Sequence, residues 1–386
     1  MVNTIINKEL IKLWVNYQIF YIFIIENNNA WMYYNYMYSN VSEENMKISI
    51  FDSPVRIYGI ADFEKNRRLE RFPLKIRKQL LDFHSSKEDS QLAHILTRTT
   101  GARAAFRTDS RNVKIVMKLK TLEHDVGMSR FSCSSAAVYT GKGESLIYRG
   151  LAVPGFDDLT GDITFTKENK MEDVMIFLPR NEVVEDIIIT LDDEAVISAP
   201  TPYKYERPVI FFGSSITEGG HASLVTNAYT ALLSRWLDFE YYNFGLSGNC
   251  FGQPVIAEYI CTLDPSVLVF DYDHNAASAD KLRKTHEPFF KLVREKLPYL
   301  PVIFMSAPNY EHMPEADERR AIIRQTYEIA KMNGDNNVYF IDGKDFFGNE
   351  ERQFCTTDTV HPNDYGFHKM AKAVEPVLKE VFEKIN

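Results

Sequence analysis

Three residues in the second half of this chain have the types and the spacing for nucleophilic catalysis. Ser215 follows an apolar run at residues 209–212, and Asp358 precedes His361 by three positions near the C-terminus. A serine hydroxyl is a poor nucleophile at neutral pH unless a neighbouring base takes its proton. An imidazole does this best when a carboxylate fixes its tautomer and supports its positive charge. Together the three residues indicate serine-dependent hydrolysis.

Each of these segments also has an ordinary structural interpretation. A serine after a strand most often caps a helix, and Thr217 occupies the second glycine position of the G-x-S-x-G nucleophile elbow. Asp358 and His361 could instead bind a metal, or the aspartate could cap a helix beside a surface histidine. No HExxH or HxH motif accompanies them, so we expect neither a metal nor another cofactor.

Two further segments could stabilise the charge that develops on an attacked carbonyl oxygen. Gly248 lies in a glycine-containing turn after the run at residues 241–244, and Asn275 follows the run at residues 267–270. A glycine amide or an asparagine side chain can donate to such an oxyanion, although both segments could be simple turns. The second segment holds three alternatives for polar roles in the same cleft: Asp271, Asp273 and His274.

Residues 201–386 show apolar runs that alternate with helix-like segments. This alternation predicts a parallel sheet covered on both faces, with a site at the carboxyl ends of the strands. The expected strands are residues 209–212, 241–244, 267–270, 302–305 and 338–341, and the expected helices are residues 229–237, 254–260, 281–297, 318–332 and 365–385.

Residues 47–200 show the two-residue alternation of short strands. Polar turns separate these strands, which predicts a β-sandwich of the jelly-roll type, with one helix near residues 73–83. Two prolines in a polar stretch, Pro200 and Pro202, indicate a domain junction, so the second domain is placed at residues 201–386. The expected strands include residues 104–108, 113–119, 135–139, 173–179 and 184–191.

The charge and cysteine content of the chain argue against some classes of partner and site. A formal net charge of −9 and the lack of a block of lysine and arginine argue against a nucleic-acid partner. The four cysteines have no CxxC spacing, which indicates neither a zinc site nor a disulfide framework. Cys250 lies near the expected site, but we interpret it as a small buried hydrophobe.

The N-terminal segment, residues 1–46, is interpreted as an extension, either an appended leader or a mis-assigned start. Its apolar stretch at residues 13–25 is too short to span a bilayer, so no stable membrane insertion is expected. No small-residue cleavage site follows it, and Met46 opens a strand-like alternation. We therefore expect a cytoplasmic location, with secretion as the alternative.

Four segments, in this order along the chain, resemble the blocks of the SGNH/GDSL hydrolase superfamily. Gly213-Ser214-Ser215 is similar to the first block, Gly248 to the glycine of the second and Asn275 to the asparagine of the third. Asp358-x-x-His361 resembles the fifth block. Two departures are visible: Ser214 stands where many members carry Asp, and the third block reads Asp-His-Asn-Ala in place of Gly-x-Asn-Asp.

The resemblance implies a flavodoxin-like three-layer α/β domain preceded by the jelly-roll sandwich. It implies that Ser215 is the nucleophile, His361 the general base and Asp358 the residue that orients the base. The backbone amides of Ser215 and Gly248, with the side-chain amide of Asn275, are then the implied oxyanion hole.

A longer stretch of sequence similarity concerns the class of substrate. Residues 213–220 resemble a bacterial subgroup with an N-terminal β-sandwich and a GxDLY-like motif, which residues 155–160 loosely echo. The two-domain layout also resembles carbohydrate acetyl esterases and some acyltransferases. These likenesses imply a serine esterase for acyl, above all acetyl, esters, with a small-molecule or glycan ester as its partner. The alternatives are acyl transfer by the same triad and a non-catalytic carbohydrate-binding protein on a hydrolase scaffold.

Overall fold

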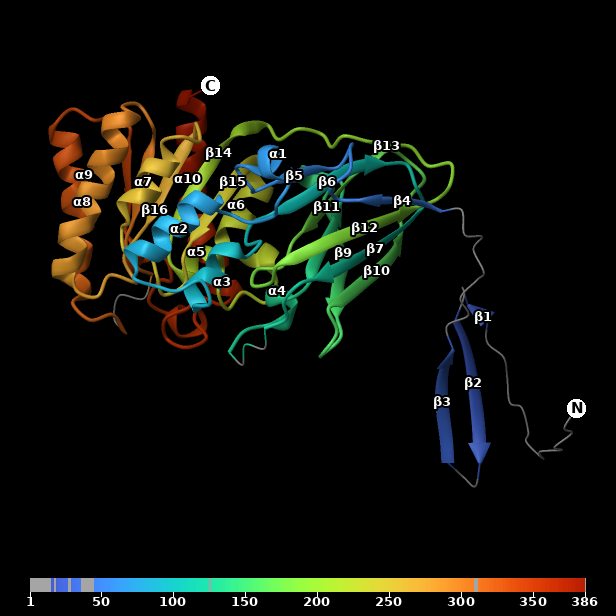
Figure 1. Ribbon diagram of the computed structural model, residues 1–386. Helices are drawn as coiled ribbons and strands as arrows, with labels where there is room; N and C mark the ends of the chain where they lie inside the picture. Colours follow the sequence, from blue (N-terminus) through green and yellow to red (C-terminus); the bar gives the residue numbers. More distant parts are fainter. Residues whose placement is uncertain are drawn as a thin grey trace, which may run out of the picture. The chain divides into compact units, whose positions relative to one another are not determined.

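The computed structural model divides the chain into two compact units, Met1–Asn45 and Met46–Asn386 (Figure 1). The described residues are 15–16, 19–26, 29–35, 45–123, 125, 127–308 and 312–385. The first unit contains an antiparallel sheet of strands β1 (Val15–Asn16), β2 (Ile19–Glu26) and β3 (Asn29–Asn35). The interpretation of residues 1–46 as a leader or mis-assigned start falls largely outside the described residues and stays a prediction.

The second half of the chain builds a five-stranded parallel sheet. Its strand order, β15–β14–β16–β17–β18, is 2-1-3-4-5 in chain order, which is the order of flavodoxin-like doubly wound sheets. In such sheets ligands bind at the carboxyl ends of the strands, where the predicted site residues lie. All five predicted strands are confirmed: β14 (Tyr205–Gly213), β15 (Phe239–Gly245), β16 (Val267–Asp271), β17 (Val302–Met305) and β18 (Val338–Ile341).

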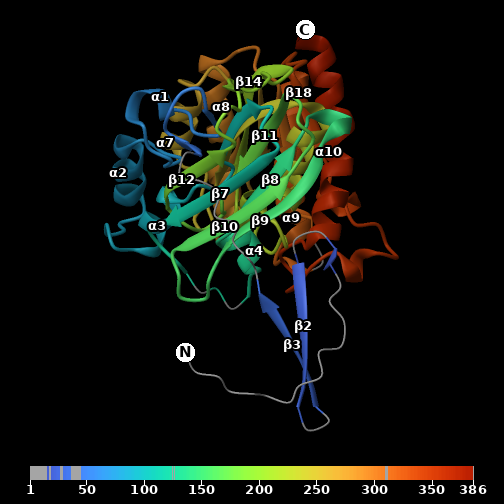
Figure 2. The ribbon, with the colours of Figure 1, turned by 90° about the vertical axis from the view of Figure 1, so that its right-hand side faces the viewer.

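Helices cover both faces of this sheet because each strand sends alternate apolar side chains into two cores. Ile210 and Phe212 of β14 pack in one core with α7, α8 and α9, whereas Val209 and Phe211 pack in the other with α6 and α10. Figure 2 places α7 and α10 on opposite sides of the unit. The five predicted helices are confirmed and α5 is new: α5 (Ser215–Glu218), α6 (Tyr229–Leu237), α7 (Pro254–Ile260), α8 (Ala279–Lys296), α9 (Ala316–Met332) and α10 (Asp364–Ile385).

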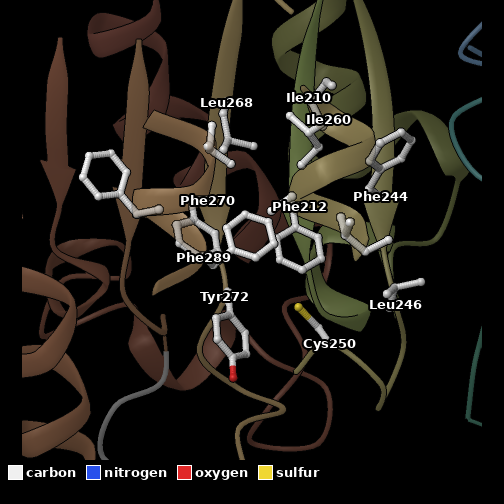
Figure 3. Close-up of a cluster of buried hydrophobic side chains, with 14 of the residues drawn as sticks. Ile210, Phe212, Phe244, Leu246, Cys250, Ile260, Leu268, Phe270, Tyr272 and Phe289 are labelled. Carbon is white, nitrogen blue, oxygen red and sulfur yellow. The ribbon is translucent and has the colours of Figure 1, made fainter. Parts of the chain in front are cut away.

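Stacked aromatic rings fill the first of these cores (Figure 3). The ring of Phe212 lies parallel to that of Phe289 on α8, with ring centroids 4.8 Å apart, and Phe270 stacks on the same ring at 4.7 Å. Cys250 is fully buried at the edge of this core, so its interpretation as a small hydrophobe is confirmed. The carboxyl ends of β14 and β16 are therefore held rigidly beneath the predicted site.

Residues 46–198 contribute a ten-stranded antiparallel sheet in the order β13–β6–β11–β8–β9–β10–β7–β12–β4, with β5 beside β6. Strands from both ends of this path share one core, which alternate residues of β7 enter. The predicted strands are confirmed, and the predicted jelly-roll type stays a prediction. The bounds are β4 (Met46–Ser49), β5 (Arg56–Tyr58), β6 (Arg103–Thr108), β7 (Asn112–Leu119), β8 (Ala136–Thr140), β9 (Ile147–Pro154), β10 (Thr160–Thr166), β11 (Glu172–Phe177), β12 (Val184–Leu191) and β13 (Ile197–Ser198).

Strands β9 and β10 were not among the predicted strands. Both carry more exposed than buried residues, and Gly150, Pro154 and Gly161 interrupt their apolar pattern. A Cβ on Gly161 would lie 2.5 Å from the backbone nitrogen of Pro154 on the neighbouring strand, so the close pairing of the strands requires glycine there. The residues that weaken the sequence signal are thus the ones that allow the strands to pair.

Four short helices interrupt the antiparallel half, and two of them pack on the α/β half. Leu80 of α2 with Leu92 and Ile95 of α3 lie in the same core as β14 and α7. The helix predicted near residues 73–83 is confirmed as α2. The bounds are α1 (Phe63–Asn66), α2 (Leu74–Phe83), α3 (Gln91–Thr97) and α4 (Arg130–Cys133).

A buried ion pair joins the antiparallel sheet to the parallel one. Arg103 of β6 donates to Glu240 of β15 at 2.6 Å, and its guanidinium lies 4.1 Å from the ring centroid of Tyr241. Glu240 also accepts from the backbone amide of Gly59 at 2.7 Å. Burial alone would lower the pKa of Arg103, but the charge of Glu240 raises it above its ordinary value, so Arg103 stays a cation. Burial raises the pKa of Glu240, and the charge of Arg103 opposes this shift.

Within the described ranges, the helices are too short or too polar to cross a membrane. The predicted cytoplasmic location stays a prediction.

Replacing Arg103 with Met should lower the free energy of unfolding by about 3–5 kcal/mol, because it leaves the buried Glu240 carboxylate without its cation. The double variant Arg103→Met/Glu240→Leu should recover much of this loss, because neither charge is then buried alone. Urea denaturation measures both effects. Lys118→Met is the matched control, since Lys118 pairs with Glu185 on the surface, and it should shift stability by less than about 0.5 kcal/mol. A double variant no more stable than Arg103→Met would contradict the ion-pair account.

Candidate active site

The predicted nucleophile lies on a sharp turn between β14 and α5. Gly213 ends the strand, Ser214 caps the helix by accepting from the Ile216 amide at 3.2 Å, and Ser215 is the first helical residue. A Cβ on Gly213 would lie 2.0 Å from Oγ1 of Thr217, so only glycine fits at this turn. Because Ser214 performs the capping, the hydroxyl of Ser215 is left for another partner.

The predicted base and carboxylate share one tight loop before α10. The amide of Thr357 donates to the carbonyl of His361 at 3.0 Å, which closes the loop. One oxygen of Asp358, Oδ1, accepts from the amides of Val360 at 3.0 Å and of His361 at 2.7 Å. Thr359 adopts a left-handed conformation with φ 69° at the tip, which is uncommon for a β-branched residue and marks a constrained turn.

The structure brings Ser215, His361 and Asp358 into one hydrogen-bonded chain. Oγ of Ser215 lies 2.7 Å from Nε2 of His361, and Nδ1 of the same ring lies 2.7 Å from Oδ2 of Asp358. Partial burial alone would raise the pKa of Asp358, but the hydrogen bonds from His361 and Val360 outweigh it and lower the pKa to about 2. The carboxylate is therefore ionised at neutral pH, so Nδ1 donates to it and Nε2 is free to accept from the serine.

The two predicted oxyanion residues lie on neighbouring loops after β15 and β16. The amide of Cys250 donates to Oδ1 of Asn275 at 3.2 Å, which ties these loops together. This contact uses the side-chain oxygen of Asn275, so its NH₂ group stays available as a donor. Gly248 has φ 68° and open space where a Cβ would point, a conformation that favours glycine and keeps its surroundings accessible.

The three alternative polar residues near Asn275 serve mainly as supports. Asp271 accepts from Thr217 and from Tyr229, and burial raises its pKa to about 7. Asp273 accepts from the Ala307 amide at 3.0 Å. Among the described residues, neither carboxylate hydrogen-bonds to Ser215, His361 or Asp358. Burial, followed by the charge of His361, lowers the pKa of His274 to about 4, so this ring is neutral.

A buried carboxylate that sequence reasoning missed lies one helical turn beyond the nucleophile. Glu218 is fully buried and lies within ion-pair distance of three guanidinium groups: Arg71 at 3.2 Å, Arg98 at 3.5 Å and Arg180 at 3.3 Å. Burial alone would raise the pKa of Glu218, but the charges of these arginines lower it below its ordinary value. All three arginines come from residues before the predicted domain junction.

The same carboxylate fixes the loop that carries Gly248. Ser247 donates its hydroxyl to Glu218 at 2.6 Å and its amide at 3.3 Å. Arg71 donates to the carbonyl of Gly245, at the end of β15, at 2.7 Å. Glu218 thus joins the nucleophile helix, the predicted oxyanion loop and the arginines of the antiparallel half. Its position three residues after Ser215 was the available signal, but a buried glutamate has no sequence pattern of its own.

A second histidine, also missed from sequence, lies against the predicted base. The rings of His221 and His361 stack with centroids 4.7 Å apart and an angle of 14° between their planes. His221, Asp358 and His361 have ligand atoms within 4.8 Å of one another, which raises the question of a metal site. Stacked rings, however, direct their nitrogen lone pairs nearly parallel, and such lone pairs do not converge on one ion. The donor set therefore fits a metal poorly.

One hollow on the described surface lies away from this site. It measures about 690 Å³ and is lined by residues of α8, α9 and the segments that follow them, such as Phe290, Arg294 and Tyr299. No residue of the Ser215–His361–Asp358 chain lines it. Its size alone therefore carries no functional conclusion.

Comparison with known proteins gives one family match. The model of the GDSL-like Lipase/Acylhydrolase family matches residues 206–379, which covers β14 through most of α10. None of the curated proteins matches the sequence.

Solved structures resemble the whole second unit. A GDSL-like lipase from Bacteroides ovatus is similar with a TM-score of 0.74 and 21% identity, over 88% of this chain and 98% of that one. A salicylyl-acyltransferase from a tetracycline biosynthetic pathway has a TM-score of 0.71 and 17% identity, with the same 88% and 98% coverage. A family two carbohydrate esterase from Cellvibrio japonicus has a TM-score of 0.56 and 11% identity, over 89% and 99%. At these identities the likeness establishes the fold.

Glu218→Gln should lower the free energy of unfolding by about 3–5 kcal/mol, because three buried guanidinium groups lose their shared counter-ion. Urea denaturation checks this. The matched control is Glu182→Gln: Glu182 is equally buried but accepts from hydroxyl and amide groups, and burial raises its pKa. Because Glu182 has hydroxyl and amide partners and not a guanidinium group, Glu182→Gln should lower the free energy of unfolding by only about 1–2 kcal/mol. Equal losses in the two variants would contradict the counter-ion role.

Proposed function

We propose that this chain is a serine esterase of the SGNH hydrolase superfamily, with Ser215 as its nucleophile; the GDSL-like lipase/acylhydrolase family model matches residues 206–379. The family match and the esterase neighbours support an ester-hydrolysing enzyme. The observation that carries the proposal is the hydrogen-bonded chain from Ser215 through His361 to Asp358.

In the proposed acylation step, Nε2 of His361 takes the proton of Ser215 as Oγ attacks the ester carbonyl carbon. The carbonyl oxygen becomes an oxyanion, and the imidazole becomes a cation whose Nδ1–H is held by Asp358 at 2.7 Å. The imidazolium then gives its proton to the leaving alcohol as the ester bond breaks. An acyl group is left on Oγ of Ser215.

In the proposed deacylation step, His361 takes a proton from water as the water oxygen attacks the acyl carbon. The imidazolium then returns this proton to Oγ of Ser215 as the bond between the acyl group and Oγ breaks, and the acid is released. In both steps the backbone amides of Ser215 and Gly248 and the side-chain amide of Asn275 would donate to the oxyanion. Loss of one such donor typically lowers kcat by about 10²–10³-fold. The hydrogen bond between Cys250 and Asn275 supports this assignment, because the side-chain oxygen of Asn275 accepts it and the NH₂ group remains available to donate.

For the substrate, we propose an acyl ester with a short acyl group, first of all an acetyl ester on a carbohydrate. Support comes from the likeness to carbohydrate esterases and from the antiparallel half, which we assign to the jelly-roll type because strands from both ends of its sheet share one core. Acyl transfer is the second candidate, because the similar acyltransferase shares 88% of this chain with a TM-score of 0.71. The intact triad geometry argues against a non-catalytic carbohydrate-binding protein.

Ser215→Ala should abolish hydrolysis of p-nitrophenyl acetate and of acetylated sugars, because no other hydroxyl lies on Nε2 of His361 in the described structure. A serine-directed fluorophosphonate should label the wild type and not this variant. Ser278→Ala, which removes a helix-capping serine at the start of α8, is the matched control and should keep full activity. Activity in Ser215→Ala equal to that of the wild type would overturn the assignment. Assays with added alcohol acceptors separate hydrolysis from acyl transfer.

Asp358→Asn should lower kcat by about 10³–10⁴-fold, because an amide NH₂ facing Nδ1 would favour the tautomer that carries its proton on Nε2. The wild-type carboxylate has a pKa of about 2, so it stays ionised as the pH falls through the weakly acidic range. A loss of activity between pH 7 and 5 should therefore not come from protonation of Asp358. Rate–pH profiles measure this, and an Asp358→Asn variant within tenfold of the wild type would contradict the role.

A further inference from the structure

The stacked histidine beside the base is placed by a constrained piece of backbone. His221 follows Gly219 and Gly220 directly after the nucleophile helix, and its backbone has φ 68°, in the left-handed region. The amide of Gly220 donates to the carbonyl of Ser215 at 2.8 Å, which folds the segment back toward the site. A non-glycine residue is rarely held in this conformation unless the surroundings enforce it.

His221 is enclosed and neutral at neutral pH. Its side chain is 9% exposed, and Gly127 lies so close that a Cβ there would be 3.7 Å from Cε1 of His221. Burial lowers the pKa of His221, and a positive charge on His361 lowers it further when that ring is protonated. Arg180 acts in the same direction, while the nearby Asp358 and Asp125 oppose the shift. His221 therefore presents the face of an uncharged aromatic ring to the ring of His361.

The close contact of His221 is with the ring of His361 and not with the carboxylate. Its Nε2 lies 3.7 Å from Oδ2 of Asp358, which is too long for a hydrogen bond. The ring planes, in contrast, are 14° from parallel with centroids 4.7 Å apart. Gly220 also lies beside the ring of His361, because a Cβ on Gly220 would lie 3.7 Å from Cδ2 of His361. The imidazole of His361 is thus held between its two hydrogen bonds and one flat face.

The stacked, uncharged ring of His221 can stabilise His361 when His361 becomes a cation. The face of an aromatic ring carries partial negative charge and attracts a cation placed over it. His361 is neutral in the resting enzyme and is a cation while the tetrahedral intermediate exists. A neutral ring stacked on it therefore stabilises the charged state more than the resting state, and this difference raises kcat and not substrate affinity.

We propose that His221 is a positioning residue for the base, whose stacked ring holds the imidazole of His361 in plane and stabilises its cationic form. This inference rests on the proposed function, in which His361 takes the proton of Ser215.

The test compares two variants at position 221. His221→Asn removes the ring and keeps a residue that tolerates a left-handed backbone, whereas His221→Phe keeps a flat ring without nitrogen atoms. With p-nitrophenyl acetate, His221→Asn should lower kcat by about tenfold with KM within about twofold, and His221→Phe should stay within about threefold of the wild type. His368→Ala removes an exposed imidazole on α10 as the matched control and should leave both constants unchanged.

A spectroscopic measurement makes the test independent of the substrate. The proton that Nδ1 of His361 shares with Asp358 should give a strongly downfield ¹H NMR signal in the wild type and in His221→Phe, and a broadened signal in His221→Asn. Wild-type kcat in His221→Asn, or equal losses in the two variants, would overturn the proposal. Wild-type activity in Ser215→Ala would instead overturn the proposed function, and the NMR comparison would still decide whether His221 orders the base.

Discussion

The buried charge of Glu218 is the interaction on which the rest of the site depends. Three guanidinium groups removed from water are costly, and one carboxylate lies within 3.5 Å of each of them, while Arg98 also pairs with Glu123 at 3.2 Å. The arginines lie before residue 200, whereas Glu218 lies on α5. Separating the two halves of the second unit would therefore break these buried ion pairs and leave charged groups without partners. The hydroxyl of Ser247 binds the same carboxylate, which extends the constraint to the loop of Gly248.

A second constraint is the short loop that carries both the base and its carboxylate. Asp358 uses one oxygen on the amides of its own turn and the other on the imidazole of His361, so the turn that positions the carboxylate also orients the ring. This arrangement keeps the carboxylate ionised and leaves Nε2 facing Ser215. The stack of His221 on His361 adds the one direction that these in-plane hydrogen bonds do not restrain.

Agreement between sequence and structure depends on the kind of signal. The five strands and five of the helices of the α/β half were predicted with bounds within about four residues, because buried parallel strands are continuous apolar runs that alternate with amphipathic helices. Strands β9 and β10 were missed because exposed faces and glycines weaken their pattern. The packing of α2 and α3 on the α/β core was missed as well, since periodicity shows that a helix has an apolar face and not what covers it.

The residue types and their spacing were enough to predict the chemistry available to this protein: a serine after a strand, a histidine with an aspartate three residues earlier, and a glycine and an asparagine at two further strand ends. Each of these signals can be read from a short stretch of sequence. A parallel sheet then brings the ends of its strands, and so these residues, to one edge. Only the tertiary structure decided the surroundings of the site. Glu218, its three arginines and His221 act through contacts between segments up to 147 residues apart, and neither ion-pair partners nor ring stacking can be read from spacing along the chain.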